Sequence, residues 1–213
     1  MIDILPNIIF SILLIVSVGL FIKNIRKLVT VIKLGKRVDR SDNPKKRFFN
    51  MARVALGQSK MVTKPISGFL HVIVYIGFII INIELLEILI DGVTGSHRFF
   101  SKYFNIYFYN FLIATFEILA LLVLVSVVLF WTRRNIFKIK RFLSNEMKGW
   151  PKFDADNILY FEIVLMLLFL SMNATDLILQ ERNFEGYYKA GSFPVSSFMV
   201  PIFDSFETST IYV

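Results

Sequence analysis

The fold is decided by residues 66–90, ISGFLHVIVYIGFIIINIELLEILI. This stretch of 25 residues contains no Lys, Arg or Pro. At about 1.5 Å of rise per residue, a helix of this length crosses the roughly 30 Å hydrocarbon core of a bilayer with some tilt. The sequence therefore predicts a membrane-spanning helix over residues 66–90.

Three further apolar stretches have the length of a membrane span, at residues 4–22, 107–131 and 158–179. The first is followed, not preceded, by basic residues, which is the reverse of a secretory signal and predicts an uncleaved anchor. With 55% hydrophobic and 15% aromatic residues, the composition is that of a polytopic membrane protein. We expect an all-α membrane helical bundle with four transmembrane helices and lipid as its surroundings.

Basic residues gather in two loops. Residues 23–64 contain 13 of the 24 Lys and Arg residues, and residues 132–157 contain seven. Because loops rich in Lys and Arg stay in the cytoplasm, both loops are predicted to be cytoplasmic and the N-terminus to lie outside. The net charge of +8 then reflects membrane topology and not binding to nucleic acid. No phosphate-binding glycine loop, nucleophile elbow or metal-ligand cluster suggests a catalytic site in this chain.

His71 is the only histidine inside a predicted span. Ionisable residues in membrane helices are costly, which makes them candidates for function. Helical periodicity places Lys64, Gly68 and Tyr75 on the side of the helix that carries His71. A haem needs a neutral nitrogen ligand, room at a glycine, aromatic walls and cations near its propionates. The alternative is a histidine hydrogen-bonded to a neighbouring helix.

A family resemblance is carried by the residues around His71. They are Leu56-Gly57-Gln58, Lys60, Lys64-Pro65, Gly68, His71 and Gly77-Phe78. In this order they resemble the cytoplasmic entry and the second transmembrane helix of the nitrate reductase gamma subunit-like family. Within that family, the chain resembles the membrane part of heterodisulfide-reductase-like, iron–sulfur-binding oxidoreductases from Bacteroidetes-type bacteria.

The resemblance implies a membrane electron-transfer module in the bacterial inner membrane. His71 would be an axial ligand of haem b, and electrons would pass between quinone and a cytoplasmic iron–sulfur partner. Arg53 and Lys64 would face that partner near the haem edge; alternatively, their loop is solvated and only fixes orientation. Because the chain has no cysteine, iron–sulfur clusters would lie on the partner or on a further segment.

The resemblance also predicts at least one more helix, which would carry the second haem-ligating histidine. Residues 180–213 are predicted to form an outer segment, because the apolar part at 193–203 is too short to span and contains Pro194 and Pro201. We therefore interpret the chain as the N-terminal part of a larger protein. Two other functions stay open, a cofactor-free membrane anchor and a transporter component.

His97 lies in the predicted outer loop between the second and third spans. A helix from His71 to Ile90 is about 28 Å long, so the two histidines belong near opposite faces of the membrane and cannot share one haem. His97 could bind a second haem near the outer face. The simpler expectation for a loop histidine is an exposed side chain.

Four carboxylates, Glu84, Glu87, Glu117 and Asp176, are predicted in the outer half of the membrane. The four spans contain no Lys or Arg that could neutralise them. We expect them to be protonated or paired with polar groups, because an ionised group buried alone is far costlier. They could form a proton exit or a quinone site, or they could only join helices by hydrogen bonds. At the start of the fourth span, residues 154–157 are predicted to supply the N-cap.

Overall fold

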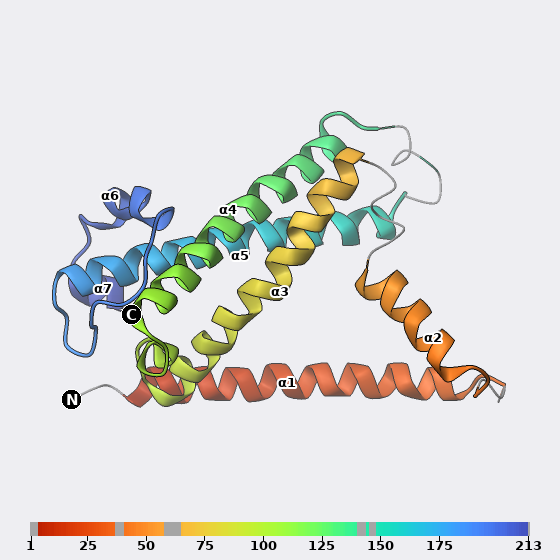
Figure 1. The fold of residues 1–213 in the computed structure, drawn as a ribbon, viewed down its shortest axis with the longest axis horizontal. Coiled ribbons are helices and arrows are strands. Elements are labelled where there is room, and N and C mark those ends of the chain that lie inside the picture. Colours follow the sequence, from red (N-terminus) through yellow and green to blue (C-terminus); the bar gives the residue numbers. More distant parts are fainter. Residues whose placement is uncertain (1–3, 37–40, 58–64, 140–143, 145–147, 213) are drawn as a thin grey trace. The chain divides into compact units, whose positions relative to one another are not determined.

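The computed structural model describes residues 4–36, 41–57, 65–139, 144 and 148–212, and the regular elements in these ranges are all helical (Figure 1). Among the described residues, four helices are long and apolar enough to cross a membrane. They are α1 (Ile4–Lys33), α3 (Pro65–Thr94), α4 (Ile106–Asn135) and α5 (Trp150–Glu181). The all-α fold class is thus confirmed, and the chain is that of a multi-pass membrane protein.

The long helices extend beyond the predicted apolar spans because polar residues continue them on either side. Helix α1 continues to Lys33, and α5 begins at Trp150 with proline in its first turn. Proline is well suited to that place, where a helix needs no N–H donor and the fixed φ angle of proline is already helical. The predicted N-cap within residues 154–157 is therefore wrong, and these residues lie inside the helix.

The chain divides into two compact units. The first contains residues up to Gly68 together with Gly92–Gly95. Its helices are α1, α2 (Pro44–Met51) and a π-helix (Ala52–Leu56). None of the residues of α1 is buried, although Asn7 Nδ2 donates a hydrogen bond to the carbonyl oxygen of Gly92 at 2.9 Å. Exposed apolar side chains along α1 fit a helix that lies in lipid.

The second unit contains Phe69–Asp91 and Ser96–Val213. Within it, α3, α4 and α5 are accompanied by short helices: η2 (Phe99–Lys102), η5 (Ser196–Phe198), α6 (Val200–Phe203) and α7 (Thr208–Tyr212). The short helices η5, α6 and α7 contact α5 (Figure 1). Helix α4 runs opposite to α3 and α5. At one end of the second unit α3 and α5 stop and α4 starts; we call it the Arg98 end. We call the opposite end the His71 end.

Two apolar clusters hold the second unit together. The first joins the middles of α3, α4 and α5 through Ile81, Ala120, Val123, Val127 and Leu170. The second lies nearer the Arg98 end, where Tyr109, Ile113 and Phe116 of α4 contact Ala190 and Phe193 of the C-terminal segment. The C-terminal segment is therefore part of the core and not a loose tail.

Gly77 allows α3 and α4 to approach closely beside the first cluster. A Cβ atom at this position would lie well inside van der Waals contact with Cγ2 of Val123. Small residues at such points let membrane helices pack backbone to backbone. The Gly77–Val123 contact thus sets the spacing of the two helices.

We predict that Gly77→Ala destabilises the protein by about 1–3 kcal/mol, because the new methyl group overpacks against Val123. In a Val123→Ala background the same change should cost much less or become stabilising, since alanine favours the helix over glycine. Melting temperatures of the four variants in detergent give this coupling. Gly19→Ala is the matched control, because a Cβ there meets no atom within 4 Å. Equal effects of Gly77→Ala in both backgrounds would contradict the close contact.

Candidate functional site

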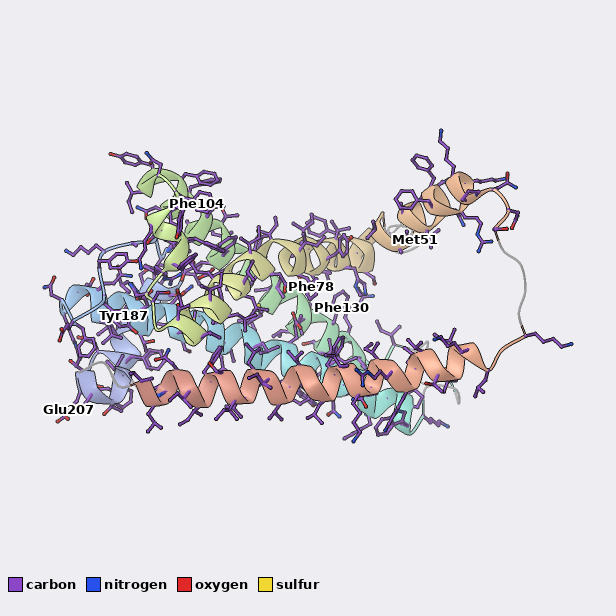
Figure 2. The ribbon with its side chains drawn as sticks, turned by 90° about the horizontal axis from the view of Figure 1, so that it is seen from below. Met51, Phe78, Phe104, Phe130, Tyr187 and Glu207 are labelled. Carbon is purple, nitrogen blue, oxygen red and sulfur yellow. The ribbon has the colours of Figure 1, made fainter. Side chains whose placement is uncertain are left out.

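His71 lies in the second turn of α3, near the His71 end of the second unit. Its imidazole ring packs against Phe130 of α4, with 4.6 Å between ring centroids, and the residue is exposed. Figure 2 places Phe130 far along the unit from Tyr187, which lies at the Arg98 end. Within the described part of the chain, His71 makes no hydrogen bond or ion pair. Among the described residues, both ring nitrogens are therefore without a polar partner.

An apolar groove of about 480 Å³ runs between α3 and α5 over α4. We call it the α3–α5 groove; its lining residues are Phe78, Ile81, Asn82, Leu85, Ile88, Val123, Glu162, Leu165, Met166, Leu168, Phe169 and Met172. Phe78, Asn82 and Leu85 lie within about 40° of His71 around the helix axis. The face of α3 that carries His71 therefore continues into the groove. The volume of the groove is in the range of small-molecule binding sites.

Glu162 is the carboxylic acid in the wall of the groove. Its side chain is half-buried and makes no hydrogen bond or ion pair to the described residues. Asn82, the amide of the groove, donates its Nδ2 to the carbonyl oxygen of Phe78 in its own helix. Glu162 is therefore the polar group that could receive a hydrogen bond from a molecule in the groove.

Arg98 forms a buried ion cluster at the opposite end. Its guanidinium donates to Asp176 Oδ2, Glu84 Oε1 and Asn173 Oδ1, each at 2.8 Å. The Arg98 side chain is only 6% exposed, and its Cζ lies 5.2 Å from the centroid of the Phe193 ring. One cation thus joins α3 to α5 in a place that water does not reach.

The charge of Arg98 is secured by its neighbours. Burial alone would lower the pKa of Arg98, but the carboxylates of Asp176 and Glu84 raise it well above its usual value. The guanidinium therefore stays protonated at any physiological pH. Its positive charge can neutralise Asp176 and Glu84, for which the sequence predicted no basic partner within the spans.

His97 belongs to the same cluster. Its Nε2 lies 2.7 Å from Asp176 Oδ1, and its side chain is only 12% exposed. The ring is flanked by Tyr187 and Tyr188, with centroids 4.3 Å and 5.1 Å away. The expected exposed side chain is therefore wrong, because Asp176 draws the imidazole into the protein.

The loop that carries His97 and Arg98 is fixed by carboxylates at the end of α3. Asp91 Oδ1 accepts the N–H of Phe99 at 3.1 Å, and Glu87 Oε1 accepts the N–H of Phe100 at 2.7 Å. Glu87 Oε2 also accepts the hydroxyl of Tyr109 in α4. Arg98 itself has a φ of 51°, an unusual backbone conformation for a long side chain. These bonds hold it in that conformation.

Glu117 is buried within α4 and contacts a different partner. Its Oε2 accepts the backbone N–H groups of Val195 at 2.9 Å and Ser196 at 3.1 Å. Glu117 Oε1 and Ser196 Oγ are also buried and have no hydrogen-bond partner in the described residues. This carboxyl group therefore binds the C-terminal segment to the middle of a membrane helix.

The structure brings some predicted site residues together and leaves others apart. Tyr75 is half-buried on α3 beyond His71 and belongs to the second unit. Gly68 and the exposed Arg53 belong to the first unit. Lys64 lies outside the described residues. Glu84, Asp176 and His97 meet at Arg98, while Glu87 and Glu117 each bind backbone N–H groups.

Arg98 and Glu162 are the site residues that sequence reasoning missed. One signal for Arg98 was available in the sequence. The predicted outer segments contain few basic residues, so Arg98 was one of the few that could neutralise the four carboxylates of the spans. No protein family, curated protein or solved structure matches this chain. The residues and their geometry therefore carry the functional conclusion.

We predict that Arg98→Gln destabilises the protein by about 3–5 kcal/mol, because Glu84 and Asp176 lose their cation while they stay buried. Adding Glu84→Gln and Asp176→Asn should restore much of this loss, since no uncompensated charge then remains. The readout is the melting temperature in detergent. Arg47→Gln is the control, because the Arg47–Asp42 pair is largely exposed and should contribute under about 1 kcal/mol. Arg98→Gln with no greater effect than Arg47→Gln would contradict the cluster's role.

Proposed function

We propose that this protein is a membrane electron-transfer module in which His71 binds a b-type haem. The observation that carries the proposal is the contrast between the two histidines of the chain. His97 is bonded to Asp176 and enclosed by tyrosines, whereas His71 has both ring nitrogens unbonded within the described residues. A membrane histidine left without a polar partner costs stability unless a ligand uses it.

The surroundings of His71 support the proposal. A haem needs an apolar, water-poor site with flat side chains against the macrocycle and a nitrogen ligand to the iron. Phe130 already packs on the imidazole, and the α3–α5 groove lies along the same face of α3. A bound haem would supply reversible one-electron chemistry. His71 would orient the iron, and Phe130 would shield one side of the imidazole from water.

We further propose that the second axial ligand comes from a chain segment beyond these 213 residues or from a partner. His97 does not suit that role, because it lies at the Arg98 end and its Nε2 is engaged with Asp176. The electron donor and acceptor would be membrane quinone and a cytoplasmic iron–sulfur protein. The two basic loops would face the cytoplasm of a bacterial cell, with the N-terminus outside.

The quinone would contact Glu162. Among the carboxylates deeper in the bundle, Glu84 and Asp176 are held by Arg98, and Glu87 and Glu117 accept backbone N–H groups. Glu162 makes no such bond to the described residues and borders the α3–α5 groove, so its carboxyl group could exchange a hydrogen bond and a proton with a quinol head group. The proposed proton acceptor therefore lies in the groove wall and away from the ion cluster.

A cofactor-free membrane anchor is the alternative. It is favoured by the internal bonding of four membrane carboxylates, which gives each of them a structural role. The same bonding speaks against a transporter, whose ionisable residues line a path for the substrate. An anchor predicts that His71 can be replaced without loss of any bound group.

The test is a reduced-minus-oxidised visible spectrum of the protein purified from membranes, both as the 213-residue chain and with any coding sequence that follows Val213. We predict a b-type α band in the longer form, and its loss in His71→Ala. His97→Gln is the matched control. It should keep the band while lowering the melting temperature, because it weakens the bond to Asp176. An unchanged band in His71→Ala, or no haem in either form, would overturn the proposal.

A further inference from the structure

We propose that residues 190–203 form a re-entrant hairpin, which enters the lipid bilayer from the Arg98 end and leaves on the same side. The expectation from the sequence was an outer segment, because this stretch is too short to span. A hairpin that goes in and returns needs no spanning length. The following contacts all lie within the second unit.

The two ends of the hairpin are fixed at the same level. Where the chain enters, the Gln180 side chain donates to the carbonyl oxygen of Ala190 at 3.0 Å and accepts its N–H at 3.1 Å. Where it leaves, Arg182 donates to the carbonyl oxygens of Asp204 at 2.7 Å and Phe206 at 3.0 Å. Gln180 and Arg182 both lie where α5 ends. Entry and exit are therefore on one side.

Between these points the chain descends along α4. The N–H of Gly191 donates to Asn110 Oδ1 at 2.9 Å, close to the start of α4. The N–H groups of Val195 and Ser196 then donate to Glu117, seven residues further along the helix. Glu117 is about 16 Å from the first residue of α4 at 1.5 Å per residue. That is roughly half of the 30 Å hydrocarbon core.

Polar backbone at this depth must find partners inside the protein, because lipid offers none. Glu117 accepts two of the N–H groups that no regular helix satisfies. Further along, Phe198 N–H donates to Val195 and Met199 N–H to Ser196, which closes the short helix η5. The buried carboxyl group of Glu117 therefore supplies the acceptor that these backbone N–H groups need.

The outer surface of the hairpin fits hydrocarbon. Residues 190–203, AGSFPVSSFMVPIF, contain no charged residue, whereas Lys189 and Asp204 flank them. Phe198 is 83% exposed and Ile202 is 62% exposed, while Phe193 and Ser196 face inward and are buried. Large apolar side chains at this depth would contact the acyl chains of lipid.

The chain has no cysteine, so single cysteines can be introduced without background. A nitroxide spin label at Phe198→Cys, in protein reconstituted in vesicles, should collide more often with oxygen than with a water-soluble nickel chelate. Glu185→Cys, an exposed position just before the hairpin, should show the reverse order and also proves that the chelate reaches this side. Because the fold leaves Phe198 exposed, low access of nickel there can only come from lipid or from another protein.

Access of nickel and of oxygen to position 198 distinguishes lipid from water and from a covering protein. High nickel access at Phe198→Cys would overturn the proposal, because the segment would lie in water. Low access of both reagents would also overturn it, since a protein and not lipid would cover the position. Replacing Glu117 with Leu should release the hairpin and raise nickel access at position 198. Glu117→Gln keeps an acceptor oxygen and should leave the label in lipid.

Discussion

The guanidinium of Arg98 joins two membrane helices from a loop that belongs to neither. It binds Glu84 from α3 and both Asp176 and Asn173 from α5, and all four side chains are buried. Removing an arginine and two carboxylates from water is costly, and it is offset only if their hydrogen bonds are nearly all made. Here Nε, Nη1 and Nη2 of Arg98 each donate to one of these residues, and His97 and Gln180 add bonds to Asp176. Glu84 Oε2 and Asn173 Nδ2 are the buried atoms of these four side chains that have no partner among the described residues. The relative positions of α3 and α5 follow from this cluster.

The two ends of the second unit differ in how their ionisable groups are bonded. At the Arg98 end, ionisable groups bond one another and the C-terminal segment, so this end gives structure. At the His71 end, the imidazole of His71 and the carboxyl group of Glu162 have no such partner in the described residues. The two groups lie on the helices that border the α3–α5 groove. This asymmetry is what one expects when one end holds the bundle and the other binds a ligand.

The apolar length of residues 66–90 and its counterparts was enough to predict four spanning helices and the all-α class. His71 could also be identified as a candidate, because a histidine within an apolar span is apparent from the sequence alone. Arg98 was not predictable as a partner of Asp176, since the two residues are 78 positions apart and no local pattern links them. The contact of Glu117 with Val195 is equally remote, so no local pattern indicated that residues 190–203 pack against α4. The burial of His97 depends on its contact with Asp176, which is 79 positions away in the sequence.

We propose that His71 is the histidine that binds a metal, because it has no polar partner among the described residues, whereas His97 is bonded to Asp176. Pulsed electron paramagnetic resonance of the oxidised protein, grown with isotope-labelled histidine, tests it directly. We expect a coupling between the haem iron and a labelled imidazole nitrogen that persists in His97→Gln and is lost in His71→Gln. A haem without any such coupling, or a coupling that depends on His97, would contradict the account.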